Sequence, residues 1–450
     1  MPIPILRQVV FDGLDSVPWV WPALKAVPWL ALVVLLKWFF GGARNTGERD
    51  MHGKVVLVTG GTSGVGEAVV RDLATHGAQI VLLTQHALSD PFLVEFIQDV
   101  RSQTNNQLLT AEQVDLASLH SIRRFATKWI DNVPPRRLDM VVLCANTTST
   151  ASARAVKEGE EVGDLAEEGV ERIWQVNYLA NFHLLSILSP AIRAQPPDRD
   201  VRIIIGACSS YLSGDLLHIT HPSSSKPFSK GKPQPNTQPL LEPTRVSPAN
   251  AFPTSKFALT AFALALQKHL SSYTRPDKFP MNAKVLLVDP GLCRTPGTRR
   301  WLTWGSLLGL LLYLLTYPIW WLVLKSPDQG AQSFLYAAMD QRFSLLAQSL
   351  DENLKETEKG GWYIKECAPR KFGRKDVTEE ETQKKLWDYS ERMIEEAEKQ
   401  GASRRAREKK EAEDAKDEAE AVKELQDYKA KVGKKDGQKQ GGSRRSRKAG

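Results

Sequence analysis

A short run of β-branched residues, a glycine-rich turn and the start of a helix follow one another directly in residues 55–76. The run Val55–Thr59 has the composition of a buried strand, and Gly60, Gly64 and Gly66 follow it before a helical pattern begins. Glycines let backbone N–H groups approach a phosphate closely, and the positive end of the helix attracts its charge. The order strand, turn, helix therefore predicts a site for the pyrophosphate of a dinucleotide.

The rest of the central region repeats the alternation of strands and helices. Further strand-like apolar runs lie at residues 80–83, 138–143, 202–205 and 284–288, and helix-like segments lie at residues 67–76, 173–188 and 255–270. Strands that alternate with helices are typical of a parallel sheet covered on both faces. The sequence therefore predicts an α/β fold, a doubly wound parallel sheet of the Rossmann type.

Composition divides the chain into three parts. We expect an N-terminal membrane-anchoring segment at residues 1–50, a folded domain at residues 51–366, and a charged tail, helical or disordered, at residues 367–450. Within the domain, residues 223–253 are rich in Ser, Pro, Lys and Asn and predict an exposed loop insertion.

Charge and cysteine content exclude two classes of function. The chain has 60 Lys and Arg against 52 Asp and Glu, and residues 401–450 hold 16 of the basic and 10 of the acidic residues. Most of the excess charge lies on the tail, so we expect no nucleic-acid binding by the folded domain. The four cysteines are far apart without a C-x-x-C pair, so we expect neither a disulfide framework nor a metal site.

Two apolar stretches stand out from this globular pattern. Residues 17–40 are rich in Trp, but their longest charge-free run, residues 26–36, is too short to span a bilayer core of about 30 Å. A secretory signal peptide is a poor match to this stretch, because no small-residue cleavage pattern follows it. Residues 301–324 carry no charge and are long enough to cross a membrane.

The turn spacing T-G-x-x-x-G-x-G resembles the short-chain dehydrogenase/reductase family, and several later motifs agree in the correct order. The resemblance extends to the retinol-dehydrogenase-like branch and to membrane or lipid-droplet oxidoreductases of fungi. It implies that the cofactor is bound by Thr59, Gly60, Thr62, Ser63, Gly64, Val65, Gly66, Asp115, Leu116, Ala145, Lys256, Pro290, Gly291 and Thr295. The family's N-N-A-G element is altered here, and reads Leu143-Cys144-Ala145-Asn146.

The resemblance also implies a catalytic set. Asn177 matches the family's Asn on the central helix, Ser210 its Ser, with Ser209 as second choice, and Lys256 its Lys. In the family a Tyr four residues before the Lys protonates the developing alkoxide, but here Phe252 stands at that position. A phenyl ring has no proton to give. Tyr211 is the nearest replacement in sequence, and its direction is open.

The choice of cofactor depends on the end of the second strand. An Asp there favours NAD through the ribose hydroxyls, and an Arg favours NADP through its phosphate. The strand ends in Thr84-Gln85-His86, so no carboxylate repels a phosphate. NAD and NADP both stay open, and we favour NADP.

Residues 301–324 lie inside the region that resembles the family, so both ends must return to one domain. A membrane hairpin meets this condition and a single crossing does not; a buried core helix or a homodimer face is the alternative. We therefore expect an oxidoreductase for a carbonyl or alcohol of a lipophilic substrate, on the cytosolic face of the endoplasmic reticulum or a lipid droplet. The rival is a catalytically silent dinucleotide-binding membrane scaffold, which Phe252 keeps open.

Overall fold

An eight-stranded sheet forms the centre of the fold, with the strand order β3-β2-β1-β4-β5-β6-β7-β8. The computed structural model describes residues 20–148, 166, 170–216, 248–344 and 361–442. Strands β1 to β7 run parallel, and β8 runs antiparallel to β7. The strands are β1 (Val55–Thr59), β2 (Gln79–Thr84), β3 (Leu109–Gln113), β4 (Met140–Leu143), β5 (Val201–Gly206), β6 (Ala283–Asp289), β7 (Trp362–Lys365) and β8 (Ala368–Arg370).

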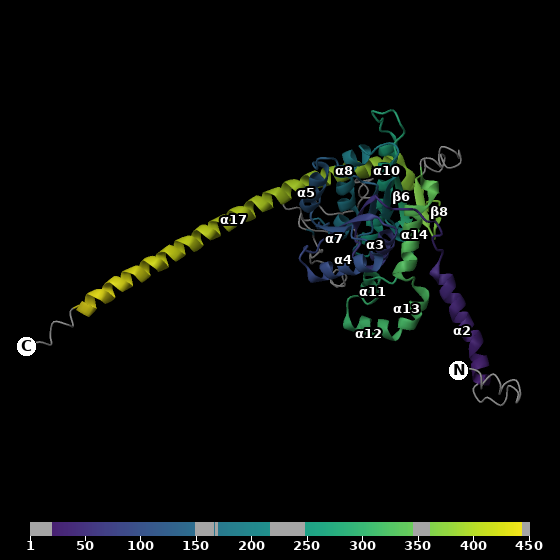
Figure 1. The fold of residues 1–450 in the computed structure, drawn as a ribbon, viewed down its shortest axis with the longest axis horizontal. Coiled ribbons are helices and arrows are strands. Elements are labelled where there is room, and N and C mark those ends of the chain that lie inside the picture. The colour runs from purple at the N-terminus through teal and green to yellow at the C-terminus, as the bar shows by residue number, and fades with distance from the viewer. Residues whose placement is uncertain (1–19, 149–165, 167–169, 217–247, 345–360, 443–450) are drawn as a thin grey trace, which may run out of the picture. The chain divides into compact units, whose positions relative to one another are not determined.

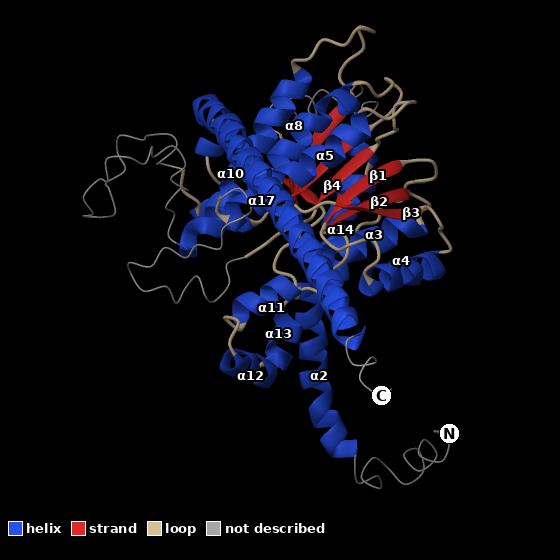
Figure 2. Ribbon diagram, turned by 90° about the vertical axis from the view of Figure 1, so that its left-hand side faces the viewer, coloured by secondary structure: helices blue, strands red, loops and turns tan. Residues whose placement is uncertain are grey.

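Helices cover both faces of this sheet, as Figures 1 and 2 show. One face is covered by α3 (Gly64–Thr75), α4 (Pro91–Thr104) and α14 (Pro327–Met339). The other is covered by α5 (Leu119–Ile130), α8 (Ala180–Arg193) and α10 (Pro248–Ser271). Helix α7 (Arg172–Trp174) and the π-helical turn η2 (Gln175–Leu179) lead directly into α8. The predicted α/β fold with a parallel sheet is confirmed.

Some elements differ from the sequence-based expectation. The strands β3, β7 and β8 and the helices α4 and α5 were not predicted. Strand β3 reads LTAEQ and buries only Leu109, so it lacks an apolar pattern. The loop expected at residues 223–253 lies outside the described residues up to position 247, and α10 already begins at Pro248.

The apolar residues 301–324 leave the domain and return to the same point. They form α12 (Leu307–Leu315), α13 (Tyr317–Val323) and the end of α11 (Pro296–Leu302). At the base, the Arg294 N–H donates to the Lys325 carbonyl over 2.8 Å, and the Lys325 N–H donates to the Leu292 carbonyl over 3.1 Å. Both ends of the excursion are therefore joined at its base. Its helices α12 and α13 are nine and seven residues long.

Helix α2 (Val20–Gly41) lies beside this excursion. Lys37 Nζ donates to the carbonyls of Trp321, over 2.6 Å, and Leu324, over 3.3 Å, at the end of α13. The ammonium also lies 4.9 Å from the centroid of the Trp321 ring. Lysine satisfies the last carbonyls of a helix well, so this contact fixes α2 to α13. Among the described residues, α2 is the one helix long and apolar enough to cross a membrane, over Leu24–Gly41.

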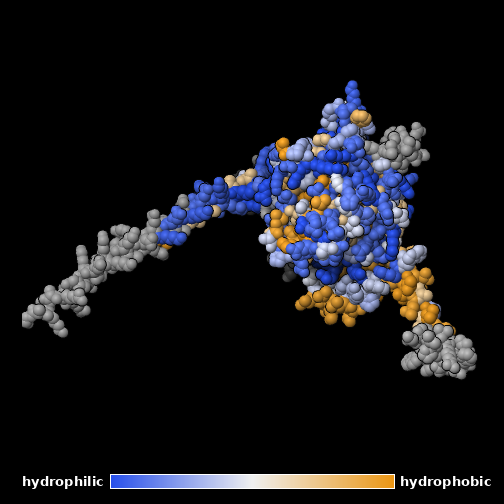
Figure 3. All heavy atoms as spheres, in the orientation of Figure 1, coloured by the Kyte–Doolittle hydropathy of each residue, from blue (hydrophilic) through white to orange (hydrophobic). Residues whose placement is uncertain are grey.

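The apolar side chains of α2, α12 and α13 are exposed. Leu308 is 80% exposed, Leu315 72% and Trp29 71%. Figure 3 shows this apolar surface over α2 and over the excursion, while hydrophilic residues dominate the view of the domain. Water-exposed apolar surface of this extent is typical of a membrane or protein contact.

The chain after β8 completes the domain before it becomes a tail. The remaining helix, α17 (Glu380–Gly442), starts with residues that pack on α8 and α10: the Trp387 ring lies 5.1 Å from Phe182 and 5.8 Å from Phe262. Tyr178 and Ser390 share a hydrogen bond of 2.6 Å. The compact unit extends to Ile394, so β8 and the first turns of α17 lie within the range that the sequence assigned to the tail.

Residues 395–450 form a second unit. Its described part is a single helix with ion pairs one turn apart, such as Lys399 with Glu395 over 2.8 Å and Arg407 with Glu411 over 2.8 Å. Water screens exposed pairs of this kind, so each contributes little to stability. They are typical of a solvated helix.

Candidate functional site

The glycine turn lies between β1 and the start of α3, at the carboxyl edge of the sheet. Gly60 and Gly64 adopt positive φ angles of 67° and 60°. A Cβ on Gly60 would lie 2.7 Å from the Ala145 backbone, at the end of β4. Strand order reverses between β1 and β4, and such a reversal opens the crevice where doubly wound sheets bind ligands.

The first turn of α3 presents backbone N–H groups at this crevice. Its N-cap, Ser63, is extended and makes no side-chain cap hydrogen bond. The first N–H groups of a helix lack intrahelical partners and attract anions, so this end fits a pyrophosphate. A Cβ on Gly64 would lie 3.1 Å from the Thr295 side chain, and one on Gly66 would lie 2.2 Å from the Gly60 carbonyl oxygen. These residues fit a dinucleotide, because larger side chains would fill the cradle.

The segments expected at the adenosine end follow β2 and β3. Asp115 is half-buried, with its N–H bonded to Ser121 Oγ over 3.1 Å and its carboxylate accepting the Ala117 N–H over 2.9 Å. At the end of β2, Gln85 is exposed, while the next residue, His86, contacts Asp90 over 2.9 Å. The carboxylate nearest to Gln85 in sequence is thus already paired.

Lys256 and Phe252 lie one turn apart on α10 and face each other. Lys256 is 3% exposed, and its Nζ donates to the Gly206 carbonyl at the end of β5 over 3.0 Å. The Nζ lies 5.8 Å from the centroid of the Phe252 ring. Burial lowers the Lys256 pKa, because a buried ammonium loses its hydration. The ring therefore occupies the place from which a phenol would contact Lys256.

Asn177 fixes the loop after β4 to α10. It is buried in the π-helical turn, and its Nδ2 donates to the Thr147 carbonyl over 2.9 Å and to Ser255 Oγ over 3.2 Å. Its Oδ1 accepts the Thr147 N–H over 2.8 Å. Turns of this kind are rare and concentrate at functional sites. The Asn177 side chain therefore joins the loop after β4 to α10.

The two candidate serines have different surroundings. Ser209 Oγ donates to Asp289 Oδ2 over 2.5 Å and accepts from Lys365 Nζ over 2.7 Å. Ser210 Oγ is buried and has no hydrogen-bond partner among the described residues. Its turn, η3 (Ser209–Ser213), packs against α10. A buried hydroxyl without a partner is costly, so the Ser210 hydroxyl differs from that of Ser209 in having a hydrogen bond left to make.

Tyr211 does not replace the missing phenol beside Lys256. It is 2% exposed, and its hydroxyl accepts the Gly373 N–H over 2.8 Å. Its ring packs edge-on against Tyr363 with the centroids 5.9 Å apart. The hydroxyl is thereby used in joining η3 to the segment after β8.

A buried polar network around Asp289 was not predicted. Asp289 is 2% exposed and accepts hydrogen bonds from Ser209, from the Tyr363 hydroxyl over 2.9 Å and from the Gly291 N–H over 2.8 Å. Lys365 Nζ lies 3.5 Å away. Burial raises the Tyr363 pKa, so this phenol is a weak acid. The alternation Tyr363-x-Lys365 on one strand face was the available signal, but it requires knowing that β7 exists.

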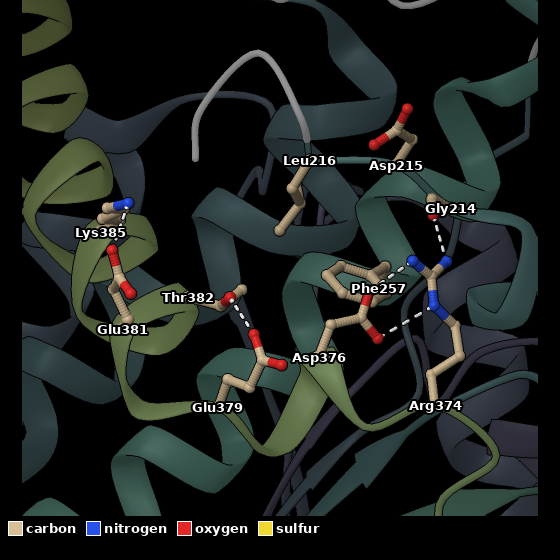
Figure 4. A pocket seen from close by; sticks show the side chains of 10 residues that line it. All are labelled: Gly214, Asp215, Leu216, Phe257, Arg374, Asp376, Glu379, Glu381, Thr382 and Lys385. Atoms are coloured by element: carbon tan, nitrogen blue, oxygen red, sulfur yellow. Dashed lines mark hydrogen bonds and ion pairs between the residues drawn. The ribbon is translucent and has the colours of Figure 1, made fainter. Parts of the chain in front are cut away.

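A polar cavity of about 470 Å³ lies beside η3, lined by Gly214, Asp215, Leu216, Phe257, Arg374, Asp376, Glu379, Glu381, Thr382 and Lys385. Figure 4 shows Arg374 reaching across it to Gly214 and Asp376. The guanidinium also lies 4.6 Å from the centroid of the Phe257 ring. Charged walls disfavour an apolar molecule, so this cavity is no place for a lipophilic substrate.

Comparison with known proteins agrees with this geometry. The sequence profile described as short chain dehydrogenase matches residues 54–228. The chain is 37% identical to an uncharacterized oxidoreductase of Schizosaccharomyces pombe, over 89% of this chain and 97% of that protein. It is 36% identical to an uncharacterized oxidoreductase of Saccharomyces cerevisiae, over 90% and 95%. It is also 26% identical to retinol dehydrogenase 13 of Homo sapiens, over 80% and 90%.

Proposed function

Since this chain belongs to the short-chain dehydrogenase family, we propose that it transfers hydride between NADP(H) and a carbonyl or alcohol of a lipophilic molecule at a membrane surface. The observation that carries the proposal is the position of Thr295. Its side chain lies next to the glycine turn, where a Cβ on Gly64 would meet it at 3.1 Å, and it also caps α11, the first helix of the apolar excursion. The membrane-facing segment therefore starts at the cofactor site itself.

The cradle residues bind and orient the cofactor. The turn at Gly60 and Gly64 and the first N–H groups of α3 hold the pyrophosphate, and Ala145, Pro290 and Gly291 border the crevice at the ends of β4 and β6. When bound, the reduced nicotinamide supplies a hydride. We favour NADP over NAD because Gln85 brings no carboxylate to the end of β2.

The catalytic roles go to the polar side chains whose hydrogen-bonding groups are not all used within the protein. The Ser210 hydroxyl donates a hydrogen bond to the carbonyl oxygen of the substrate and so orients it. With Phe252 unable to give a proton and Tyr211 bonded to Gly373, the Lys256 ammonium is the acid that remains at this end of α10. Burial lowers its pKa, which makes the ammonium a better proton donor, either directly or through a water.

The lipophilic substrate and the membrane are inferred from the apolar surface. Trp301 and Trp304, 48% and 60% exposed, follow the domain, and the leucines of α12 come after them. Tryptophan favours the membrane interface and leucine the hydrocarbon. A re-entrant excursion, which enters and leaves the membrane on one side, suits either the cytosolic face of the endoplasmic reticulum or a lipid droplet. The name of the human relative, a retinol dehydrogenase, also agrees with a lipophilic substrate.

The second candidate is a membrane scaffold that binds the dinucleotide without turnover. Phe252 beside Lys256 and the unpartnered Ser210 hydroxyl favour it, because both are consequences of a missing phenol. The two functions differ in one measurable respect, which is turnover.

The test is an assay of the full chain, purified in detergent and returned to phosphatidylcholine vesicles. NADPH consumption is followed with retinal, long-chain aldehydes, sterol ketones and small water-soluble aldehydes. We expect turnover with one of the lipophilic carbonyls and none with the small aldehydes. Saturable NADPH binding without turnover on any of them would favour the scaffold, and turnover with the small aldehydes alone would contradict the lipophilic substrate.

A further inference from the structure

The apolar surface of α2 and the excursion carries basic residues and no acidic ones. The charged residues of residues 20–47 and 290–327 are Lys25, Lys37, Arg44, Arg294, Arg299, Arg300 and Lys325. Neither range contains Asp or Glu, although acidic residues number 52 against 60 basic ones in the whole chain. Carboxylates are therefore absent from the segments that build this surface.

Three of these cations are already used within the protein. Lys37 caps α13, Lys325 pairs with Glu366, and Arg294 donates to the Tyr317 hydroxyl over 3.3 Å. These contacts hold α2, the excursion and the domain together. These three charges therefore already have partners within the protein.

The arginines 44, 299 and 300 are different. All three are exposed, and none of their guanidinium groups makes a hydrogen bond or ion pair with the part of the chain that the structure describes. We call Arg44, Arg299 and Arg300 the arginine rim. Arg44 lies three residues after the end of α2, and Arg299 and Arg300 lie in the last turn of α11.

The rim lies between the domain and the apolar helices. Along the chain, Arg299 and Arg300 come directly before the exposed Trp301 and Trp304 and the leucines of α12. In Figure 1, α11 and the end of α2 both lie where the excursion meets the domain. The order of domain, guanidinium, indole and leucine matches the order of water, headgroup, interface and hydrocarbon across one leaflet.

We propose that the arginine rim binds the phosphate groups of anionic phospholipids, so that the chain selects negatively charged leaflets. The inference rests on the proposed membrane function and adds the lipid class to it. A guanidinium binds phosphate through two parallel N–H groups, which suits an exposed arginine at headgroup depth. Each basic residue near an anionic surface contributes about 1 kcal/mol, or about fivefold in binding.

The experiment measures flotation of the full chain with phosphatidylcholine vesicles and with vesicles that also contain phosphatidylserine. We expect tighter binding to the anionic vesicles and a preference that weakens as salt is raised. The double variant Arg299→Gln/Arg300→Gln should lose about 25-fold of this preference, or about fivefold for each arginine, while binding to neutral vesicles persists.

Two matched arginine pairs serve as controls. Arg123→Gln/Arg124→Gln on α5 and Arg404→Gln/Arg405→Gln on α17 change the same net charge at residues that do not belong to the rim. Both should keep most of the preference. If the Arg404/Arg405 variant loses it and the rim variant does not, the inference is overturned. A wild-type chain that binds both vesicles equally overturns the inference alone, and one that binds neither also overturns membrane attachment.

Discussion

A substitution of Lys256 can distinguish a functional role from a structural one, because the side chain is a buried charge with few partners. Its side chain is 3% exposed, and it makes one hydrogen bond to the described residues, to Gly206 over 3.0 Å. Removing an ammonium from water costs several kcal/mol, and a single carbonyl and the Phe252 ring offset only part of that cost. We infer that Lys256 serves the function of the site and does not stabilise the fold.

The replacement Lys256→Met keeps the unbranched shape and removes the charge. It leaves the Gly206 carbonyl unpaired, at a cost of about 1–3 kcal/mol, but it also removes the cost of burying the ammonium. We therefore expect the free energy of unfolding to change by less than about 2 kcal/mol. Turnover should fall about 100- to 10,000-fold, the usual contribution of a general acid.

The pH dependence of stability gives a second readout. Because burial lowers the Lys256 pKa below the value of 10.5, the unfolded chain binds more protons than the folded chain between the two pKa values. The contribution of Lys256 to stability therefore rises with pH in that window. Below this window, the folded wild type bears the full cost of the buried charge. The free energy of unfolding of Lys256→Met should therefore be highest relative to the wild type there, and this difference should shrink as the pH rises toward 10.5.

The measurement is urea unfolding in detergent, followed by tryptophan fluorescence at a series of pH values. Lys284→Met is the matched control, because Lys284 is also buried, at 2% exposure, but lies on β6. This control should leave turnover unchanged. A loss of more than about 3 kcal/mol in Lys256→Met, with the pH dependence unaltered, would show that Lys256 holds the fold together and refute the reasoning.

Three further outcomes are expected. Phe252→Tyr should change turnover little, measured by NADPH consumption, because Lys256 already supplies the proton; a rise of about 100- to 10,000-fold would instead favour the scaffold, which lacks a proton donor. Trp387→Ala should lower the free energy of unfolding by about 2 kcal/mol in urea titrations, because this half-buried ring covers α8 and α10, whereas Lys399→Ala in the tail should leave it unchanged. Cysteines placed at Thr295 and Ser326 should react with a membrane-impermeant maleimide from the same side of a vesicle, and labelling from opposite sides would contradict the re-entrant excursion.

The parts of the fold that the sequence predicted are those fixed by local pattern. Strand β1 is buried along its whole length, so its β-branched run was enough to predict a strand. Gly60 and Gly64, which follow it, adopt positive φ angles that only glycine takes easily. The contact between Phe252 and Lys256 is local as well, since residues one turn apart on a helix share a face. The sequence began this helix at residue 255 and placed Phe252 in the loop, so the contact follows only from the earlier start of α10 at Pro248.

The remainder depends on distant partners. The direction of Tyr211 is set by Gly373, 162 residues away in the chain, and the Asp289 network depends on Tyr363 and Lys365 from a strand with no strong pattern. Residue spacing carries no information about such pairs. The difference between Ser209 and Ser210 also depends on distant residues. Asp289 and Lys365 bond to Ser209 and leave the Ser210 hydroxyl unpaired.

The central claim is that the turn at Gly60 and Gly64 holds a dinucleotide for hydride transfer. Calorimetric titration of the full chain in detergent with NADPH and with NADH tests it most directly. We predict saturable binding of both, tighter for NADPH. Gly64→Leu should abolish it, because Gly64 has a positive φ and a Cβ there would crowd Thr295, whereas Gly297→Leu, at an open position, should not. A wild-type chain that binds neither dinucleotide would contradict the account.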